Sequence, residues 1–138
     1  MLGPGRSGSR CWRRGGELER GYGFGVARQL LEAALARASP DERKGLLAGA
    51  AVLAEPVFSA SASAPPPGTG TTQSVLHGLY WLVANLAERA SLLLAIDDVQ
   101  WADEPSLRFL LYLARRLDGV PVAVALTLRT GDASADAE

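Results

Sequence analysis

Two adjacent carboxylates, Asp97 and Asp98, are the side chains of this sequence best placed to do chemistry. They follow an apolar run in the string LLLAIDDVQWAD, which spans Leu92 to Asp103. A run that is apolar on both faces predicts a strand buried on both sides of a parallel sheet. The acids then fall at the carboxyl end of that strand, where open α/β sheets bind their ligands. Since phosphate-bound Mg²⁺ prefers carboxylate oxygen, the pattern predicts the metal-holding strand of a nucleotide-binding domain, the Walker B strand.

A third candidate residue, Arg129, follows the next predicted strand. Asp103 is expected to cap a helix that has Pro105 in its first turn. A second all-apolar strand is predicted at Val120–Leu128, so the chain from Leu92 onward reads as a βαβ unit with two adjacent parallel strands. Arg129 is then expected on the same sheet edge as the two acids. A guanidinium beside two carboxylates suits Mg²⁺ together with a phosphate charge.

The elements that must position these residues are predicted from apolar periodicity and capping signals. Besides the helix after Asp103, helices are expected at Val26–Arg37, Ser39–Pro56 and Gln73–Ala90. In the second of these, Ser39 can be the N-cap, Pro40 occupies the first helical position and Glu42 completes a capping box. A further short strand is possible at Cys11–Arg14.

The domain organisation follows from composition along the chain. Residues 1–10 are rich in Gly, Ser and Pro and are expected to be a disordered N-terminus, and residues 131–138 form an acidic tail. The part from 11 to 130 is expected to be one domain, interrupted by a flexible Pro/Ser/Gly-rich loop at 59–72.

Composition excludes several classes of function. The chain has 138 residues, about one domain, and its 48% hydrophobic content allows a core. A net charge of −1 gives no support for a nucleic-acid surface, and no apolar run is long enough to span a bilayer. Cys11 is the single cysteine, which excludes an internal disulfide and favours a reducing compartment. We therefore expect a cytoplasmic protein with neither a nucleic-acid nor a membrane partner.

The longer strings carry a family resemblance. IDDVQWADEPSL, followed by FLLYLARRL and PVAVALTLRT, closely resembles the STAND ATPases, an AAA-like P-loop class, and in particular the large LuxR-type transcriptional regulators. GGELERGYGFGVARQLLE and HGLYWLVANLA resemble other segments of that family, so that the resemblance covers residues 11–130. It implies an α/β fold, namely an incomplete P-loop NTPase fragment of the ASCE type, with a three-layer αβα arrangement, two to three parallel strands and about four helices.

The resemblance also implies roles for the candidate residues, with ATP and Mg²⁺ as cofactors. Asp97 would hold Mg²⁺ through water, Asp98 would polarise the attacking water, and Arg129 would contact or sense the γ-phosphate. Gln100, Trp101 and Asp103 match the family signature, but the sequence assigns them no chemical role.

One departure from the family pattern limits these expectations. The Walker A loop, G-x-x-x-x-G-K-[ST], does not occur in the sequence, and the single lysine, Lys44, lies in a predicted helix with no glycine loop before it. The implied strand order would leave the outer edge of Val120–Leu128 unpaired, an arrangement that soluble domains normally avoid.

Three hypotheses follow. The first is a partial ATPase domain that does not bind ATP on its own. The second is a non-catalytic module that docks through the exposed sheet edge onto itself or a partner ATPase subunit. The third is a gene remnant without independent function.

Overall fold

A sheet of three parallel strands carries the fold. The computed structural model describes residues 9–14, 23–59 and 69–130. The elements, in chain order, are β1 (Ser9–Arg14), α1 (Gly25–Arg37), α2 (Pro40–Leu46), η2 (a 3₁₀ helix, Gly49–Ala54), α3 (Glu55–Phe58), α4 (Thr69–Arg89), β2 (Leu92–Asp97), η3 (a 3₁₀ helix, Val99–Trp101), α5 (Glu104–Ala114) and β3 (Val122–Leu126).

The strand that bears the acids is the middle strand of the sheet. The strand order is β1-β2-β3, and both pairs are parallel, with Cys11 opposite Leu94 and Leu94 opposite Val124. Helix α5 connects β2 to β3, so the predicted βαβ unit is confirmed. The short strand at Cys11–Arg14 is also confirmed, but it begins at Ser9, within the stretch expected to be disordered.

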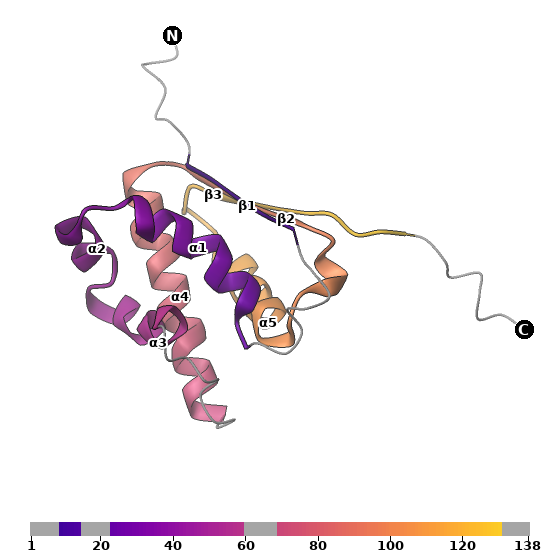
Figure 1. Cartoon of the computed structure of the whole chain (residues 1–138), viewed down its shortest axis with the longest axis horizontal. Coiled ribbons are helices and arrows are strands. Elements are labelled where there is room, and N and C mark those ends of the chain that lie inside the picture. The colour runs from indigo at the N-terminus through magenta and orange to yellow at the C-terminus, as the bar shows by residue number, and fades with distance from the viewer. Residues whose placement is uncertain (1–8, 15–22, 60–68, 131–138) are drawn as a thin grey trace, which may run out of the picture.

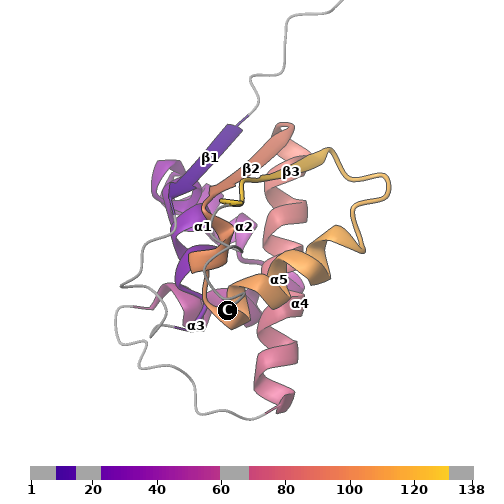
Figure 2. The same cartoon turned by 90° about the vertical axis from the view of Figure 1, so that its right-hand side faces the viewer.

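The described helices all lie on one side of the sheet (Figures 1 and 2). On that side Leu92, Leu94 and Ile96 of β2 are buried in the core. On β3, by contrast, Ala123 and Ala125 are exposed. The α/β class and the parallel sheet are as expected, while the second helical layer of a three-layer arrangement is not found among the described residues.

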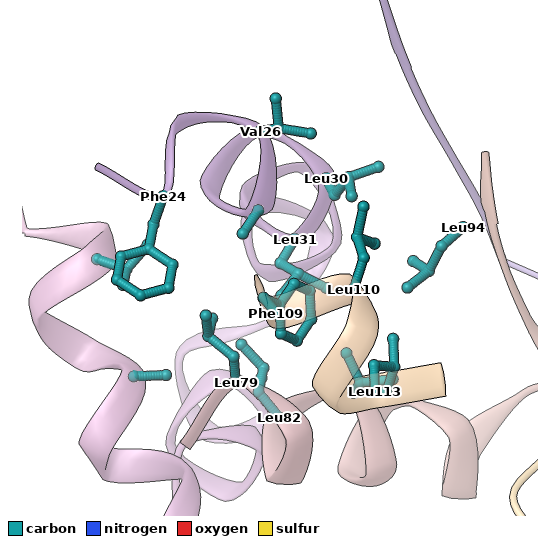
Figure 3. Packing of buried hydrophobic residues seen from close by; sticks show 14 of the residues in the cluster. Phe24, Val26, Leu30, Leu31, Leu79, Leu82, Leu94, Phe109, Leu110 and Leu113 are labelled. Atoms are coloured by element: carbon teal, nitrogen blue, oxygen red, sulfur yellow. The ribbon is translucent and has the colours of Figure 1, made fainter. Parts of the chain in front are cut away.

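The core lies between the sheet and helices α1, α4 and α5. Figure 3 shows its side chains converging from these elements, with Phe109 of α5 fully buried among leucines of α1 and α4. Leu94 reaches into the same cluster from the middle strand. Burial of this kind stabilises the fold by about 25 cal/mol per Å² of apolar surface, and it ties the acid-bearing strand to the helices on that side of the sheet.

The second predicted helix begins as expected but is much shorter. The capping box is present: the Ser39 amide donates to Glu42 Oε2 over 2.7 Å, and the Glu42 amide donates to Ser39 Oγ over 3.2 Å. However, α2 ends at Leu46, since Leu47 is its C-cap and Ala48 is extended with φ −77° and ψ 161°. Gly49 follows with a φ of +62°, a conformation that favours glycine. The expected continuous helix to Pro56 is wrong. Because the 3₁₀ helix η2 and helix α3 follow instead, the described part has five α-helices rather than about four.

Helix α4 is longer than predicted and packs closely on η2. It begins at Thr69 rather than Gln73, so the last residues of the expected 59–72 loop are helical. The middle of that loop lies outside the described residues, as do residues 1–8 and the tail 131–138. Gly78 lets η2 approach, since a Cβ there would lie 2.4 Å from the Ala54 backbone nitrogen. Within the described residues, no helix has both the length and the apolarity needed to cross a membrane.

Candidate functional site

The two acids lie where β2 ends and the chain turns sharply. Asp97 is the last residue of β2, and Asp98 follows it with φ 53° and ψ 54°, the left-handed conformation. Along a regular strand, neighbouring side chains point to opposite faces. The left-handed residue breaks that alternation, and Asp is among the few non-glycine residues that tolerate this conformation. Both carboxylates therefore lie near the carboxyl ends of β2 and β3.

Thr127, just past the end of β3, contacts both acids. Its hydroxyl donates a hydrogen bond to Asp97 Oδ1 and accepts one of 2.9 Å from the Asp98 amide. Its backbone extends the sheet, because the Thr127 amide donates to the Ile96 carbonyl and the Val99 amide donates to the Thr127 carbonyl, each over 2.9 Å. Sequence reasoning missed this residue. The available signal was a single hydroxyl that interrupts the apolar run PVAVALTL.

Arg129 reaches the same place from β3. Its Nε lies 3.1 Å from Asp98 Oδ1. The Asp98 side chain is only 11% exposed, whereas that of Arg129 is 78% exposed. The guanidinium thus provides a countercharge for a carboxylate that is largely withdrawn from water. The predicted placement of Asp97, Asp98 and Arg129 on one sheet edge is therefore confirmed.

The donor set at this edge fits one kind of metal ion. Asp97 and Asp98 supply hard carboxylate oxygens. The described residues contain no group of three or more His, Cys, Asp or Glu side chains able to hold a metal. Mg²⁺ bound to a nucleotide needs only one or two carboxylates, because water and phosphate supply its remaining ligands. Asp97 and Asp98 are therefore suitable as the protein ligands of a nucleotide-bound Mg²⁺.

The signature residues after the acids form the turn that leads to α5. Val99–Trp101 is the 3₁₀ helix η3, closed by hydrogen bonds from the Trp101 amide to the Asp98 carbonyl and from the Ala102 amide to the Val99 carbonyl, both 3.0 Å. Asp103 is the N-cap of α5, as predicted, and accepts a hydrogen bond of 3.0 Å from the Ser106 amide. The string DDVQWAD thus folds as one tight connection between the acids and α5.

The lysine of the chain lies apart from this edge in the fold. Lys44 is in α2, as predicted, and its side chain is exposed. Lys44 belongs to the helix that begins with the Ser39 capping box. A capping box is not a phosphate-binding glycine loop. The described residues at the carboxyl ends of β2 and β3 therefore supply acids, a hydroxyl and a guanidinium, but no lysine.

Comparison with known proteins agrees with this arrangement. A family model described as AAA ATPase domain matches residues 16–125, which include β2, both acids and most of β3. Neither a curated protein nor a solved structure gives a significant match. The match covers most of the chain, and the strand order and the acid-bearing middle strand are consistent with it. The chain belongs to the AAA ATPase domain family.

Proposed function

We propose that the chain is the acid-bearing part of a STAND-type regulatory ATPase domain. In this proposal Asp97 holds Mg²⁺, Asp98 polarises the attacking water and Arg129 contacts the γ-phosphate. The observation that carries the proposal is the convergence of these three residues at one sheet edge, with Arg129 Nε 3.1 Å from Asp98 Oδ1. Mg²⁺, when bound with a nucleotide, neutralises the charge of the phosphates.

The residues of this chain would prepare that site in two ways. Thr127 holds Asp97 through its hydroxyl and fixes the Asp98 backbone, so the two carboxylates keep their relative position. The exposed Arg129 guanidinium can exchange its carboxylate partner for a phosphate oxygen, because arginine binds both kinds of oxygen.

On its own the chain is expected not to hold ATP tightly. The sequence has no G-x-x-x-x-G-K-[ST] loop, and the backbone amides and lysine of that loop supply most of the phosphate binding in P-loop proteins. Isothermal titration calorimetry with Mg²⁺·ATP tests this point. We expect no saturable binding up to millimolar ATP, and a saturable isotherm would contradict the expectation that the chain alone does not hold ATP.

More specifically, we propose that the chain is part of the ATPase domain of a LuxR-type transcriptional regulator that acts in the cytoplasm. It is supported by the string IDDVQWADEPSL and by the single cysteine. Sequencing the DNA on both sides of the coding region tests it. A Walker A loop encoded upstream and a helix-turn-helix encoded downstream would support the assignment, and flanks that encode unrelated complete proteins would count against it.

A second candidate function is favoured by the outer edge of β3. Among the described strands, β3 pairs only with β2, and Leu126 and Leu128 are 50% and 60% exposed. An apolar edge strand is a template for pairing with another strand. The alternative is therefore a non-catalytic module that docks onto itself or a partner ATPase subunit through this edge. Size-exclusion chromatography with light scattering tests self-association, and a monomer that persists at high concentration would argue against it.

A further inference from the structure

Asp103 makes long-range contacts that its role as a helix cap does not require. Besides the Ser106 amide of its own helix, its carboxylate accepts hydrogen bonds from two backbone amides at the start of α1. These run from the Phe24 amide to Oδ2 over 2.8 Å and from the Val26 amide to Oδ1 over 3.2 Å. Asp103 is only 3% exposed. One buried carboxylate thus serves the N-termini of two helices that lie far apart in the sequence.

Helix α1 depends on these contacts because it has no side-chain cap of its own. Its N-cap residue is Phe24, which adopts a left-handed φ of 61° and provides no side-chain capping hydrogen bond. The first amides of a helix need outside acceptors. Asp103 supplies them for Val26, and the fully buried Ser106 accepts a bond of 3.1 Å from the Ala27 amide. The positive ends of both helix dipoles also converge on the single negative charge.

The turn that carries the second acid is held at both of its ends. At one end, the Asp98 and Val99 amides donate to Thr127, each over 2.9 Å. At the other end, Ala102 leads directly into Asp103, which is tied to α1. Asp98 keeps a left-handed φ of 53° between these anchors. A conformation of this kind persists when the surrounding structure over-determines it.

We propose that Asp103 is a positioning residue, which holds the Asp98 turn in place by fastening it to the start of α1. A displacement of α1 at Phe24 would then be transmitted to the acids through one carboxylate. The coupling itself can be measured without any nucleotide. Its meaning for the metal site rests on the proposed function, in which Asp98 polarises the attacking water.

Amide hydrogen exchange by NMR on the full chain tests the proposal with the variant Asp103→Ser. Serine is as good an N-cap as aspartate, so it preserves the cap of α5 at Ser106. Its single short hydroxyl cannot also reach Phe24 and Val26. We expect the exchange protection of the Asp98 and Val99 amides to fall by about tenfold or more, the equivalent of one charge-assisted hydrogen bond, although these amides donate to Thr127 rather than to Asp103.

Two controls separate this effect from simpler ones. Leu46→Ala removes a buried side chain of α2 and shows how much exchange comes from global destabilisation. Glu104→Gln removes the neighbouring exposed acid, which pairs with Arg108 over 2.7 Å, and shows the effect of one lost charge at the start of α5.

The proposal is overturned if Asp103→Ser lowers protection only at Phe24 and Val26, or lowers it at Asp98 and Val99 no more than Leu46→Ala does at equal stability. Asp103→Asn, which keeps one acceptor oxygen and the size of the side chain, gives the same readout if the serine variant does not fold. In Asp103→Asn we expect a smaller loss of exchange protection at Asp98 and Val99 than in Asp103→Ser. No loss at these amides would again overturn the proposal.

Discussion

The Asp98 carboxylate is nearly buried, while its countercharge, Arg129, is mostly in solvent. An ion pair with one exposed partner is worth at most about 1 kcal/mol, since water screens it and the long side chain loses freedom. Arg129 is therefore held loosely enough to change partner. The more rigid part of the site is the backbone and hydroxyl of Thr127, which fix both acids.

Replacing Thr127 with valine tests that rigidity. The change keeps the shape of the side chain but removes its donor to Asp97 and its acceptor for the Asp98 amide. We expect a loss of about 1–2 kcal/mol in the free energy of unfolding, measured in urea, because an amide loses its partner. Thr127→Ser keeps the hydroxyl and should cost much less. Equal stability of the valine and serine variants would show that the hydroxyl does not hold the acids.

The sequence predicted part of this site and not the rest. The placement of Asp97, Asp98 and Arg129 follows from strand direction alone, since the carboxyl ends of parallel strands meet at one edge. The contacts of Thr127 with the two acids and the bonds from Asp103 to α1 join residues that are distant along the chain. No local pattern encodes such pairs, although the hydroxyl that interrupts the apolar run PVAVALTL was a signal for Thr127 itself.

At the scale of the elements, local capping chemistry was predicted better than helix length. The Ser39–Glu42 capping box depends on neighbouring residues and is present as expected. The run LLAGAAVLAE predicted a longer helix, but the chain leaves the helical conformation at Ala48, which is extended, and at Gly49, which has a positive φ. Beyond it, η2 is held by its packing on α4, so tertiary contact decided the outcome.

The capping box makes a prediction about pH. The hydrogen bond from the Ser39 amide lowers the pKa of Glu42 below its ordinary value of 4.5. A carboxyl whose pKa is lower in the folded state stabilises the fold above its ordinary pKa, and that contribution disappears as the pH falls through the lowered value. Glu42→Gln should therefore be less stable than the unmodified chain at pH 7, and the difference should shrink in acid.

Thermal unfolding between neutral and acidic pH measures this difference. Glu88→Gln, at an exposed position of α4, serves as the control for the loss of one negative charge. A difference between Glu42→Gln and the unmodified chain that stays constant down to acidic pH would contradict the assignment to the capping box.

The contact of α4 with η2 makes a second prediction at this scale. In an exposed helix, replacing glycine with alanine stabilises by about 1 kcal/mol. At Gly78 the added Cβ would lie 2.4 Å from the Ala54 nitrogen and 2.7 Å from the Leu53 carbonyl carbon. We therefore expect Gly78→Ala to destabilise by about 1–3 kcal/mol, as overpacking does. In Gly45→Ala of α2 the nearest atom is 3.7 Å away, and that control should not destabilise. Two variants of similar stability would disprove the close approach.

For the whole molecule, the α/β class and the parallel pairing of β2 with β3 were predictable, because hydrophobic runs and βαβ handedness determine them. The covering of only one face of the sheet by the described helices was not predictable. The apolar run from Val120 to Leu128 predicted burial on both faces, yet Ala123, Ala125 and Leu126 of β3 are exposed. The apolar pattern of a strand indicates which of its faces could be buried. It does not indicate whether another element packs on that face.

In the proposed function, Asp97, Asp98 and Arg129 form the protein side of a magnesium–nucleotide site. Paramagnetic broadening by Mn²⁺·ATP, followed by NMR on the full chain, tests it most directly, because brief occupancy far below saturation is sufficient. We predict selective broadening of the amide signals of Asp97, Asp98 and Thr127 that disappears in Asp97→Asn and persists in Asp118→Asn, an exposed acid elsewhere. Broadening that survives Asp97→Asn, or that is no stronger at the acids than at Asp118, would contradict the claim.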